Sequence, residues 1–198
     1  MRRHLLVPLF VLLALAPAAA AAQETQRRVD FAELEKVVRE ELEKSNTPGA
    51  ALAIVSGDRV IYAKGFGVAS VETGAPVAPD MLFRLGSTTK MLTAAVLVGL
   101  AEEGKLSLDE PVGKHVKGLS PGLSRLTAHQ LLSHTAGLKD EAPMQGLHDD
   151  TALGARVRSW TDNFLLFEPG KVYSYSNPGY VLAGLLIEEA GGKAYAEM

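Results

Sequence analysis

The sequence contains no cysteine among its 198 residues. A chain without thiols cannot form disulfide bonds, so a disulfide-stabilised scaffold is excluded. The same absence excludes a lipoprotein anchored through cysteine, catalysis by a thiol, and zinc held by thiolates. Any chemistry that the protein performs must therefore come from other side chains.

The sequence also lacks any segment in which basic residues are concentrated. It has 20 Lys and Arg against 23 Asp and Glu, a formal net charge of −3. Without a basic patch, nucleic acid is not expected as a partner. Hydrophobic residues make up 47% of the chain, enough to bury a core, and the length indicates one domain with room for two lobes.

A hydrophobic run long enough to span a bilayer is missing too. Leu5 to Ala16 is apolar but too short to span comfortably. It follows a short basic stretch, Met1 to His4, and precedes small residues, Pro17 to Ala22. This three-part layout predicts a signal peptide over residues 1–22 and a periplasmic or secreted protein. An uncleaved anchor is the alternative, which the small-residue cleavage site disfavours.

Cleavage would change the charge of the chain and remove its only apolar anchor. The basic pair Arg2-Arg3 hints at twin-arginine export, but the residues after it do not support that route. Losing the pair lowers Lys and Arg from 20 to 18 against 23 acidic residues, a net charge of about −5. The mature protein is therefore expected to keep no stable membrane anchor.

The mature chain begins with a predicted helix and hairpin. Apolar residues recur every three or four positions over Asp30 to Ser45, with Asp30 and Glu33 placed for a capping box. Two β-prone runs, Ala50 to Val55 and Arg59 to Val68, flank a turn that contains glycine. Gly65 and Gly67 in the second run indicate a bulge or a close backbone approach. A phosphate-binding loop would need a third glycine where Ser70 stands.

The segment from Ser87 to Glu103 predicts a helix that is apolar on almost every side. Such a helix is expected to be buried at the centre of its domain. Its first turn nevertheless carries Ser87-Thr-Thr-Lys90. Further helices are expected over residues 127–133, 152–166 and 179–190, the last opened by Asn177-Pro178. No internal repeat is visible.

Ser87 and Lys90 have the spacing at which two side chains share one face of a helix. Serine is a poor nucleophile until a neighbour takes its proton, and a desolvated lysine loses its own proton more easily. The helix N-terminus adds positive potential near a developing oxyanion. The alternative is an N-capping serine beside a solvated lysine, which the spacing alone does not exclude.

Tyr175-Ser-Asn177 follows the break at Glu168-Pro-Gly170 and precedes a helix, so a loop is expected to present it. A phenol beside an ammonium group ionises more easily and could shuttle protons. The Asn177 amide could hold a substrate carbonyl. The alternative is a core tyrosine next to an N-capping asparagine.

Together, Ser87-x-x-Lys90 and Tyr175-x-Asn177 resemble the first two active-site motifs of the penicillin-recognising serine hydrolases, in the class C β-lactamase branch. That branch includes β-lactamases, D-alanyl-D-alanine carboxypeptidases and related esterases. Four connecting segments agree in order: residues 83–90, 106–112, 131–138 and 168–177.

The resemblance implies an α/β (α+β) fold of the β-lactamase/transpeptidase type over residues 23–198. An antiparallel sheet flanked by helices is expected, with a mostly helical lobe over residues 80–192. It implies that Ser87 is the nucleophile of an acyl-enzyme, that Lys90 assists its deprotonation, and that Tyr175 is the general base or acid. Asn177 would position the substrate and Lys90. The Ser87 N–H would be half of the oxyanion hole.

The sequence departs from the family at its third motif, a Lys-Thr-Gly or His-x-Gly strand. Nothing after Asn177 matches it, and His134-Thr-Ala-Gly137 precedes the tyrosine motif and does not replace it. The C-terminal sheet strands are therefore expected to be missing, as in a fragment that cannot turn over substrate alone. The rival interpretation is a non-catalytic domain that senses penicillin or peptidoglycan, or an inactive remnant.

The histidines and the substrate complete the expectations. In the family, the residue at His134 is structural, and His129 and His134 lack a carboxylate in a zinc-type pattern, so no metal or cofactor is expected. The expected substrates are β-lactams, peptidoglycan D-Ala peptides or small esters. The sequence does not choose among them.

Overall fold

A computed structural model of the protein describes residues 30–141, 149 and 151–198. The predicted signal peptide, residues 1–22, lies outside these residues. The chain divides after Leu82 into two compact units, here the N-terminal unit (described from residue 30) and the C-terminal unit (residues 83–198). Over the part of the chain that the structure describes, no helix is both long and apolar enough to cross a membrane.

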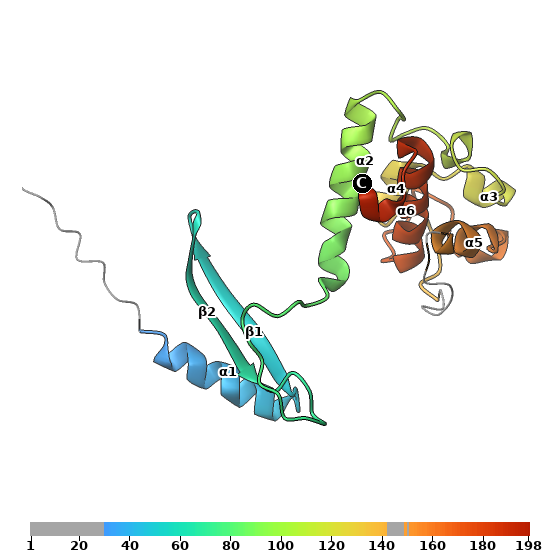
Figure 1. Ribbon diagram of the computed structural model, residues 1–198. Helices are drawn as coiled ribbons and strands as arrows, with labels where there is room; N and C mark the ends of the chain where they lie inside the picture. The colour runs from blue at the N-terminus through green and yellow to red at the C-terminus, as the bar shows by residue number, and fades with distance from the viewer. Residues whose placement is uncertain (1–29, 142–148, 150) are drawn as a thin grey trace, which may run out of the picture. The chain divides into compact units, whose positions relative to one another are not determined.

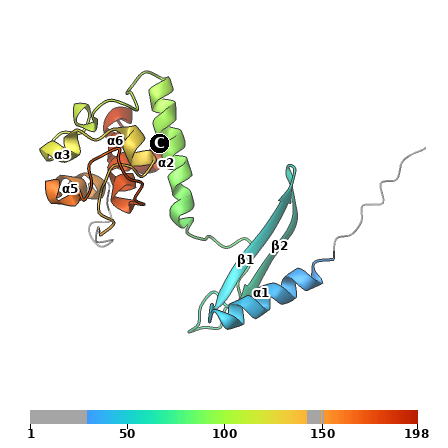
Figure 2. The ribbon, with the colours of Figure 1, turned by 180° about the vertical axis from the view of Figure 1, so that it is seen from behind.

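The N-terminal unit consists of helix α1 (Ala32–Lys44) and an antiparallel hairpin of β1 (Gly49–Ser56) and β2 (Arg59–Gly67). Helix α1 lies along the hairpin (Figures 1 and 2) and packs mainly on β2. The predicted helix and hairpin are confirmed. The capping box is not, because the side chain of Asp30 accepts a hydrogen bond from the Ala32 N–H at 2.9 Å instead.

Two glycines in β2 allow the chain to approach itself closely, as the sequence indicated. A Cβ atom on Gly65 would lie 1.9 Å from the carbonyl oxygen of Val77. Gly67 has a φ of +66°, and a Cβ there would lie 2.1 Å from the carbonyl oxygen of Pro48. The hairpin's register shifts where Ile54 pairs with Tyr62 and Val55 with Val60, so that Ile61 of β2 is the extra residue and neither glycine is. The glycines therefore serve backbone packing, not the bulge.

The C-terminal unit is built almost entirely of helices around one apolar core. Its α-helices are α2 (Thr89–Glu102), α3 (Pro121–Ser124), α4 (Ala128–Leu132), α5 (Ala152–Arg158) and α6 (Asn177–Gly191). Short 3₁₀ turns span Gly86–Thr88, Val112–Lys114, Asp162–Phe164 and Tyr195–Glu197. Helix α6 packs on α2, α4 and α5 (Figure 1), and so forms the centre of the unit.

Helix α6 is buried along most of its length. Leu182, Ala183 and Ile187 are fully inaccessible to solvent. Burying a leucine or isoleucine side chain stabilises a fold by about 1.5–3 kcal/mol. The helix begins where the Ser176 side chain accepts the Gly179 N–H at 3.1 Å, and it ends at Gly192 with a φ of +72°. A serine N-cap and a glycine C-cap are common at helix ends, but the start was predicted at Asn177-Pro178 and Ser176 was not identified as the cap.

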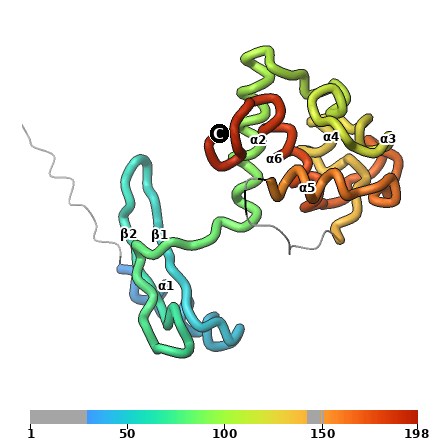
Figure 3. Tube along the Cα trace, turned by 45° about the vertical axis from the view of Figure 1, so that its right-hand side comes forward, coloured from blue at the N-terminus to red at the C-terminus, as the bar shows by residue number. Residues whose placement is uncertain are grey.

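Helix α2 is buried on one side only, so the prediction of a fully buried helix is wrong for the described chain. Thr93, Leu97 and Leu100 are buried, whereas Met91 and Leu92 are 66% and 55% exposed. The reason is that α6 is the main described helix in contact with it. The last residues also lie beside α2 (Figure 3), where the Tyr195 hydroxyl is 2.6 Å from Thr93 Oγ1.

The other helices differ from prediction mainly in length. Helix α4 has the expected cap, with a capping box between Thr127 and Gln130. Helix α5 ends at Arg158, well before the predicted residue 166. Thr161 adopts an extended conformation there, and Leu165 then forms a bridge with Leu138. The weak helical pattern after Arg158 yields because this pairing places the chain against the segment after α4.

Candidate active site

Ser87 lies in a tight turn at the entrance to α2. The residues Gly86–Thr88 form a 3₁₀ turn that leads directly into the helix. Gly86 has a φ of +55°, a conformation that side-chain-bearing residues rarely adopt. The Ser87 side chain is consequently exposed at the N-terminal end of α2, where the helix contributes positive potential.

Lys90 connects α2 to the N-terminal end of α6. Its Nζ atom donates hydrogen bonds to Ser87 Oγ at 3.2 Å and to Asn177 Oδ1 at 2.7 Å. The same ammonium group lies 4.8 Å from the ring centre of Tyr175 and 5.3 Å from that of Tyr180. The predicted spacing therefore does place the amine against the hydroxyl, and aromatic faces surround the charge.

Tyr175 completes the contacts of the serine hydroxyl. Its phenol oxygen lies 2.7 Å from Ser87 Oγ. The Lys90 ammonium beside that oxygen lowers the pKa of Tyr175, and the hydrogen bond with Ser87 lowers it further. Burial and the negative charge of Asp140 act in the opposite direction but do not prevail. A phenol with a lowered pKa at 2.7 Å from a hydroxyl is able to exchange a proton with it.

Asn177 is the first residue of α6, and Asp140 fixes its orientation. The Asn177 backbone N–H donates to Asp140 Oδ1 at 2.7 Å, and its side-chain Nδ2 lies 3.5 Å from Asp140 Oδ2. A carboxylate at a helix N-terminus is favoured by the helix dipole. With its NH₂ group turned to Asp140, Asn177 presents its oxygen to Lys90. Sequence reasoning missed Asp140, since nothing distinguishes it from other surface acidic residues.

His134 also reaches the site, although the sequence indicated only a structural role. Its ring is stacked on that of Tyr175, with centres 4.4 Å apart. Its Nδ1 atom accepts a hydrogen bond from the Ser176 N–H at 3.1 Å. In the described chain, the side chains that hydrogen-bond to Ser87 Oγ are those of Tyr175 and Lys90. His134 therefore touches the tyrosine rather than the nucleophile.

A metal centre is not indicated. Over residues 30–141, 149 and 151–198, no group of three or more His, Asp and Glu is arranged to hold a metal ion. His129 is exposed and lies 3.1 Å from Asp109.

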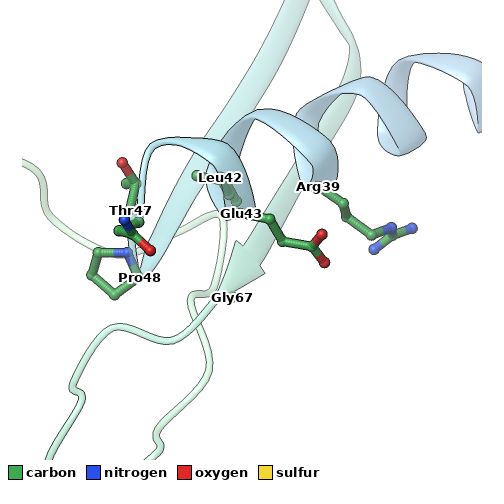
Figure 4. A pocket seen from close by; sticks show the side chains of 7 residues that line it. Arg39, Leu42, Glu43, Thr47, Pro48 and Gly67 are labelled. Carbon is green, nitrogen blue, oxygen red and sulfur yellow. The ribbon is translucent and has the colours of Figure 1, made fainter.

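Two hollows in the described chain are large enough to hold a small ligand. One of about 230 Å³ adjoins Lys90 and Asn177, and its other walls are mainly apolar. A larger open groove of about 600 Å³ lies at the C-terminal end of α1 (Figure 4), where Arg39 and Glu43 project from the same side of the helix. The groove at α1 contains none of the residues that contact Ser87, whereas the first hollow is lined by Lys90, whose amine bonds to Ser87.

Known proteins share both the sequence pattern and this fold. The sequence profile of the Beta-lactamase family matches residues 34–198. Penicillin-binding protein 4* of Bacillus subtilis (strain 168) is 32% identical over 161 residues, which cover 78% of this chain and 35% of that protein.

Solved structures agree. The octameric penicillin-binding protein homologue from Pyrococcus abyssi matches with a TM-score of 0.71 and 34% identity, covering 85% of this chain and 41% of that one. The D-alanine carboxypeptidase AmpC from Burkholderia cenocepacia matches with a TM-score of 0.64 and 31% identity, covering 82% and 44%.

The chain spans about a third of the length of the curated relatives that it matches. The matched region includes both units and all four site residues that the sequence singled out. The fold is of the β-lactamase/transpeptidase type, and the chain belongs to the beta-lactamase family.

Proposed function

We propose that the protein is a serine hydrolase that forms an acyl-enzyme through Ser87. One observation carries this proposal: Ser87 Oγ lies within hydrogen-bonding distance of both the Tyr175 hydroxyl and the Lys90 amine. A serine becomes nucleophilic when a neighbouring group accepts its proton. A serine that merely capped α2 would not need these two partners.

The proton moves along the contacts that the site contains. As Ser87 Oγ attacks the substrate carbonyl carbon, its proton passes to the Tyr175 oxygen, which the positive charge of Lys90 stabilises in its ionised form. Tyr175 then protonates the leaving group, an amine or an alcohol. Water then attacks the ester carbonyl while its proton passes to the ionised Tyr175, and Tyr175 returns a proton to Ser87 Oγ as the carboxylic acid leaves.

The negative charge on the carbonyl oxygen needs donors of its own. The Ser87 N–H, at the N-terminal end of α2, is proposed as one of them. No Lys-Thr-Gly or His-x-Gly triplet follows Asn177 in this sequence to supply a second. Loss of one such donor slows acyl transfer by roughly a hundred- to a thousand-fold. Residues 1–198 alone are therefore proposed to acylate slowly.

The proposed substrates are β-lactams, D-Ala peptides of peptidoglycan or small esters. The support is the similarity to a penicillin-binding protein and to a D-alanine carboxypeptidase. A periplasmic or secreted location is proposed as well, on the strength of the signal-like residues 1–22. In that location the chain would meet peptidoglycan.

The test is labelling by a fluorescent penicillin, read by mass spectrometry of the intact protein and of its peptides. Wild type should gain one adduct on Ser87, and Ser87→Ala none. Ser159→Ala is the matched control, since Ser159 is exposed and bonds only to the Arg156 carbonyl oxygen. A persistent adduct supports an acyl acceptor that does not turn over, as in a sensor, whereas rapid loss supports an enzyme. Absence of any adduct on wild type contradicts the proposal and indicates an inactive remnant.

A further inference from the structure

His134 is held in an unusual backbone conformation directly behind the tyrosine of the site. Its φ is +56°, in the left-handed region that residues with side chains seldom occupy. Its carbonyl oxygen accepts the Ser174 N–H at 2.8 Å, and its ring nitrogen Nδ1 accepts the Ser176 N–H at 3.1 Å. One residue thus binds the backbone on both sides of Tyr175.

The second of these hydrogen bonds requires an uncharged imidazole. Nδ1 can accept a proton donor only while it carries no hydrogen, so the neutral ring must have its hydrogen on Nε2. Ser176 stands between Tyr175 and Asn177, and its side chain caps α6. The bond from Ser176 to His134 therefore fixes the residue that joins the general base to the amide that holds Lys90.

The ring of His134 adds a packing contact to the same tyrosine. It stacks on Tyr175 with an interplanar angle of 28°, and Lys90 lies 4.8 Å from the centre of that tyrosine ring. An imidazolium in this place would bring a second positive charge near Lys90. Neutral His134 supplies the stack without that repulsion.

The groups that face His134 come from several elements. They are Lys90 of α2, Asp140 after α4, Tyr180 of α6, and Tyr173 and Tyr175 of the preceding loop. Burial and the charge of Lys90 lower the pKa of His134, and Asp140 opposes them less strongly. The neutral form is thus the one that prevails near pH 7.

We propose that neutral His134 is a positioning residue for Tyr175, and that its protonation at acid pH releases the Ser176 N–H and disorders the general base. The consequence for catalysis rests on the proposed function, whereas the hydrogen bond and its dependence on pH do not. A purely space-filling histidine would pack equally well with either ring nitrogen protonated. The two roles therefore predict different behaviour on titration.

Nuclear magnetic resonance of the wild-type chain, with uniform ¹⁵N labelling and ¹³C-labelled tyrosine, tests the hydrogen bond without any substrate. We expect the Nε2–H tautomer of His134 and a midpoint below 6.5, the ordinary value for histidine. The Ser176 amide and the Tyr175 ring signals should shift with the same midpoint. An Nδ1–H tautomer, or a Ser176 amide that does not respond when His134 titrates, overturns the proposal.

Two variants separate the acceptor from the ring. His134→Asn places an oxygen where Nδ1 stood, tolerates a positive φ and does not titrate. His134→Phe keeps a ring but has no acceptor. Protection of the Ser176 amide from hydrogen exchange should survive in His134→Asn and be lost in His134→Phe. Loss in both, or retention in both, contradicts a role for the acceptor. If His134→Phe does not fold, His134→Asn is compared with wild type alone. Loss of Ser176 amide protection in His134→Asn then contradicts the role of the acceptor.

Penicillin labelling adds the catalytic consequence. Below the midpoint of His134, wild-type labelling should fall by about tenfold or more, because small displacements of a catalytic group have effects of this size. In His134→Asn, which has no imidazole to protonate, the labelling rate should not fall over the same pH range. Equal pH profiles for the two proteins contradict the inference. If wild type is never labelled, the proposed function fails instead, while the magnetic resonance result still tests the His134 contact.

Discussion

The two units differ in how their apolar residues are used. In the C-terminal unit, eighteen hydrophobic residues form one buried cluster around α6. In the N-terminal unit, α1 has no fully buried residue, and the described core is limited to Phe66 and Val77. All four predicted site residues belong to the better packed unit. The exposed and half-buried side chains of the site are thus carried by the better packed of the two units.

The N-terminal unit relies more on polar contacts. Glu35 of α1 lies 2.6 Å from the Nζ atom of Lys64 in β2 and 3.1 Å from the Tyr62 hydroxyl. The Lys64 hydrogen bond lowers the pKa of Glu35. Exposed pairs of this kind stabilise a fold only slightly. The contrast between the units can therefore be tested by matched substitutions.

The largest effect is expected from removing the Tyr175 hydroxyl in the C-terminal unit, with the Tyr62 hydroxyl in the N-terminal unit as the matched control. Tyr175→Phe removes the proposed proton acceptor of Ser87 and should lower the rate of penicillin labelling by roughly a hundred- to ten-thousand-fold. Tyr62→Phe removes the hydroxyl bonded to Glu35 and should leave the rate unchanged. Penicillin labelling quenched at successive times and read by mass spectrometry measures the rates of both variants. A normal rate in Tyr175→Phe would assign the proton transfer to Lys90 alone.

Core packing should distinguish the units next. Leu182 in α6 is fully buried, so Leu182→Ala should destabilise the C-terminal unit by about 2–5 kcal/mol. Leu34 in α1 is only half-buried, and Leu34→Ala should cost about 1 kcal/mol or less. Urea unfolding followed by circular dichroism gives both values. Equal costs would show that the N-terminal unit is better packed than its exposed surface suggests.

The carboxylate of Asp140 should have a smaller effect that is specific to the site. Asp140→Asn keeps the shape of the side chain but replaces the carboxylate that accepts the Asn177 N–H with a neutral amide. Hydrogen bonds to charged groups contribute about 1.5–3 kcal/mol to stability. We expect labelling to slow by about tenfold as Asn177 loses its fixed orientation. Asp109→Asn, at an exposed residue that contacts His129, is the control and should label normally. Equal rates in the two variants would remove Asp140 from the site.

The smallest effect is expected from the pH dependence of Glu110. Its hydrogen bond with His115, and then that with Lys114, lower the pKa of Glu110 from 4.5 to about 2. A lowered carboxyl pKa stabilises the folded state above pH 4.5, and this stabilisation is lost as the pH falls toward about 2. Glu110→Gln should therefore show a shallower loss of stability over that interval. Parallel curves for the two proteins would show that the contacts do not persist in solution.

Much of the site was predictable because its signals are local. The spacing of Ser87 and Lys90 predicts that their side chains lie on one helical turn, and the structure places Lys90 Nζ 3.2 Å from Ser87 Oγ. Tyr175 and Asn177 were identified by the loop before α6 together with the resemblance to the family, and both contact that pair. The start of α6 was predicted at Asn177-Pro178, although its Ser176 cap was not. Each motif is local in the sequence, whereas the contact that brings Tyr175 to Ser87 joins positions 88 residues apart.

The remainder depends on contacts between distant segments. Asp140 contacts Asn177 across 37 positions, and no local pattern marks an exposed aspartate as the partner of a helix N-terminus. The contact of His134 with Ser176 spans 42 positions and depends on a positive φ that the sequence does not indicate. Helix α2 has the composition of a buried helix, but its surroundings in the described chain leave Met91 and Leu92 exposed.

The bond between Lys90 and Asn177 has a consequence for heating. It joins the first turn of α2 to the first turn of α6, and the nucleophile and its base belong to opposite sides of that joint. A slight separation of the two helices would part Ser87 from Tyr175 while the secondary structure of both persists. On heating, penicillin labelling should therefore be lost at a lower temperature than the helical structure. The loss of labelling would then report when α2 and α6 separate.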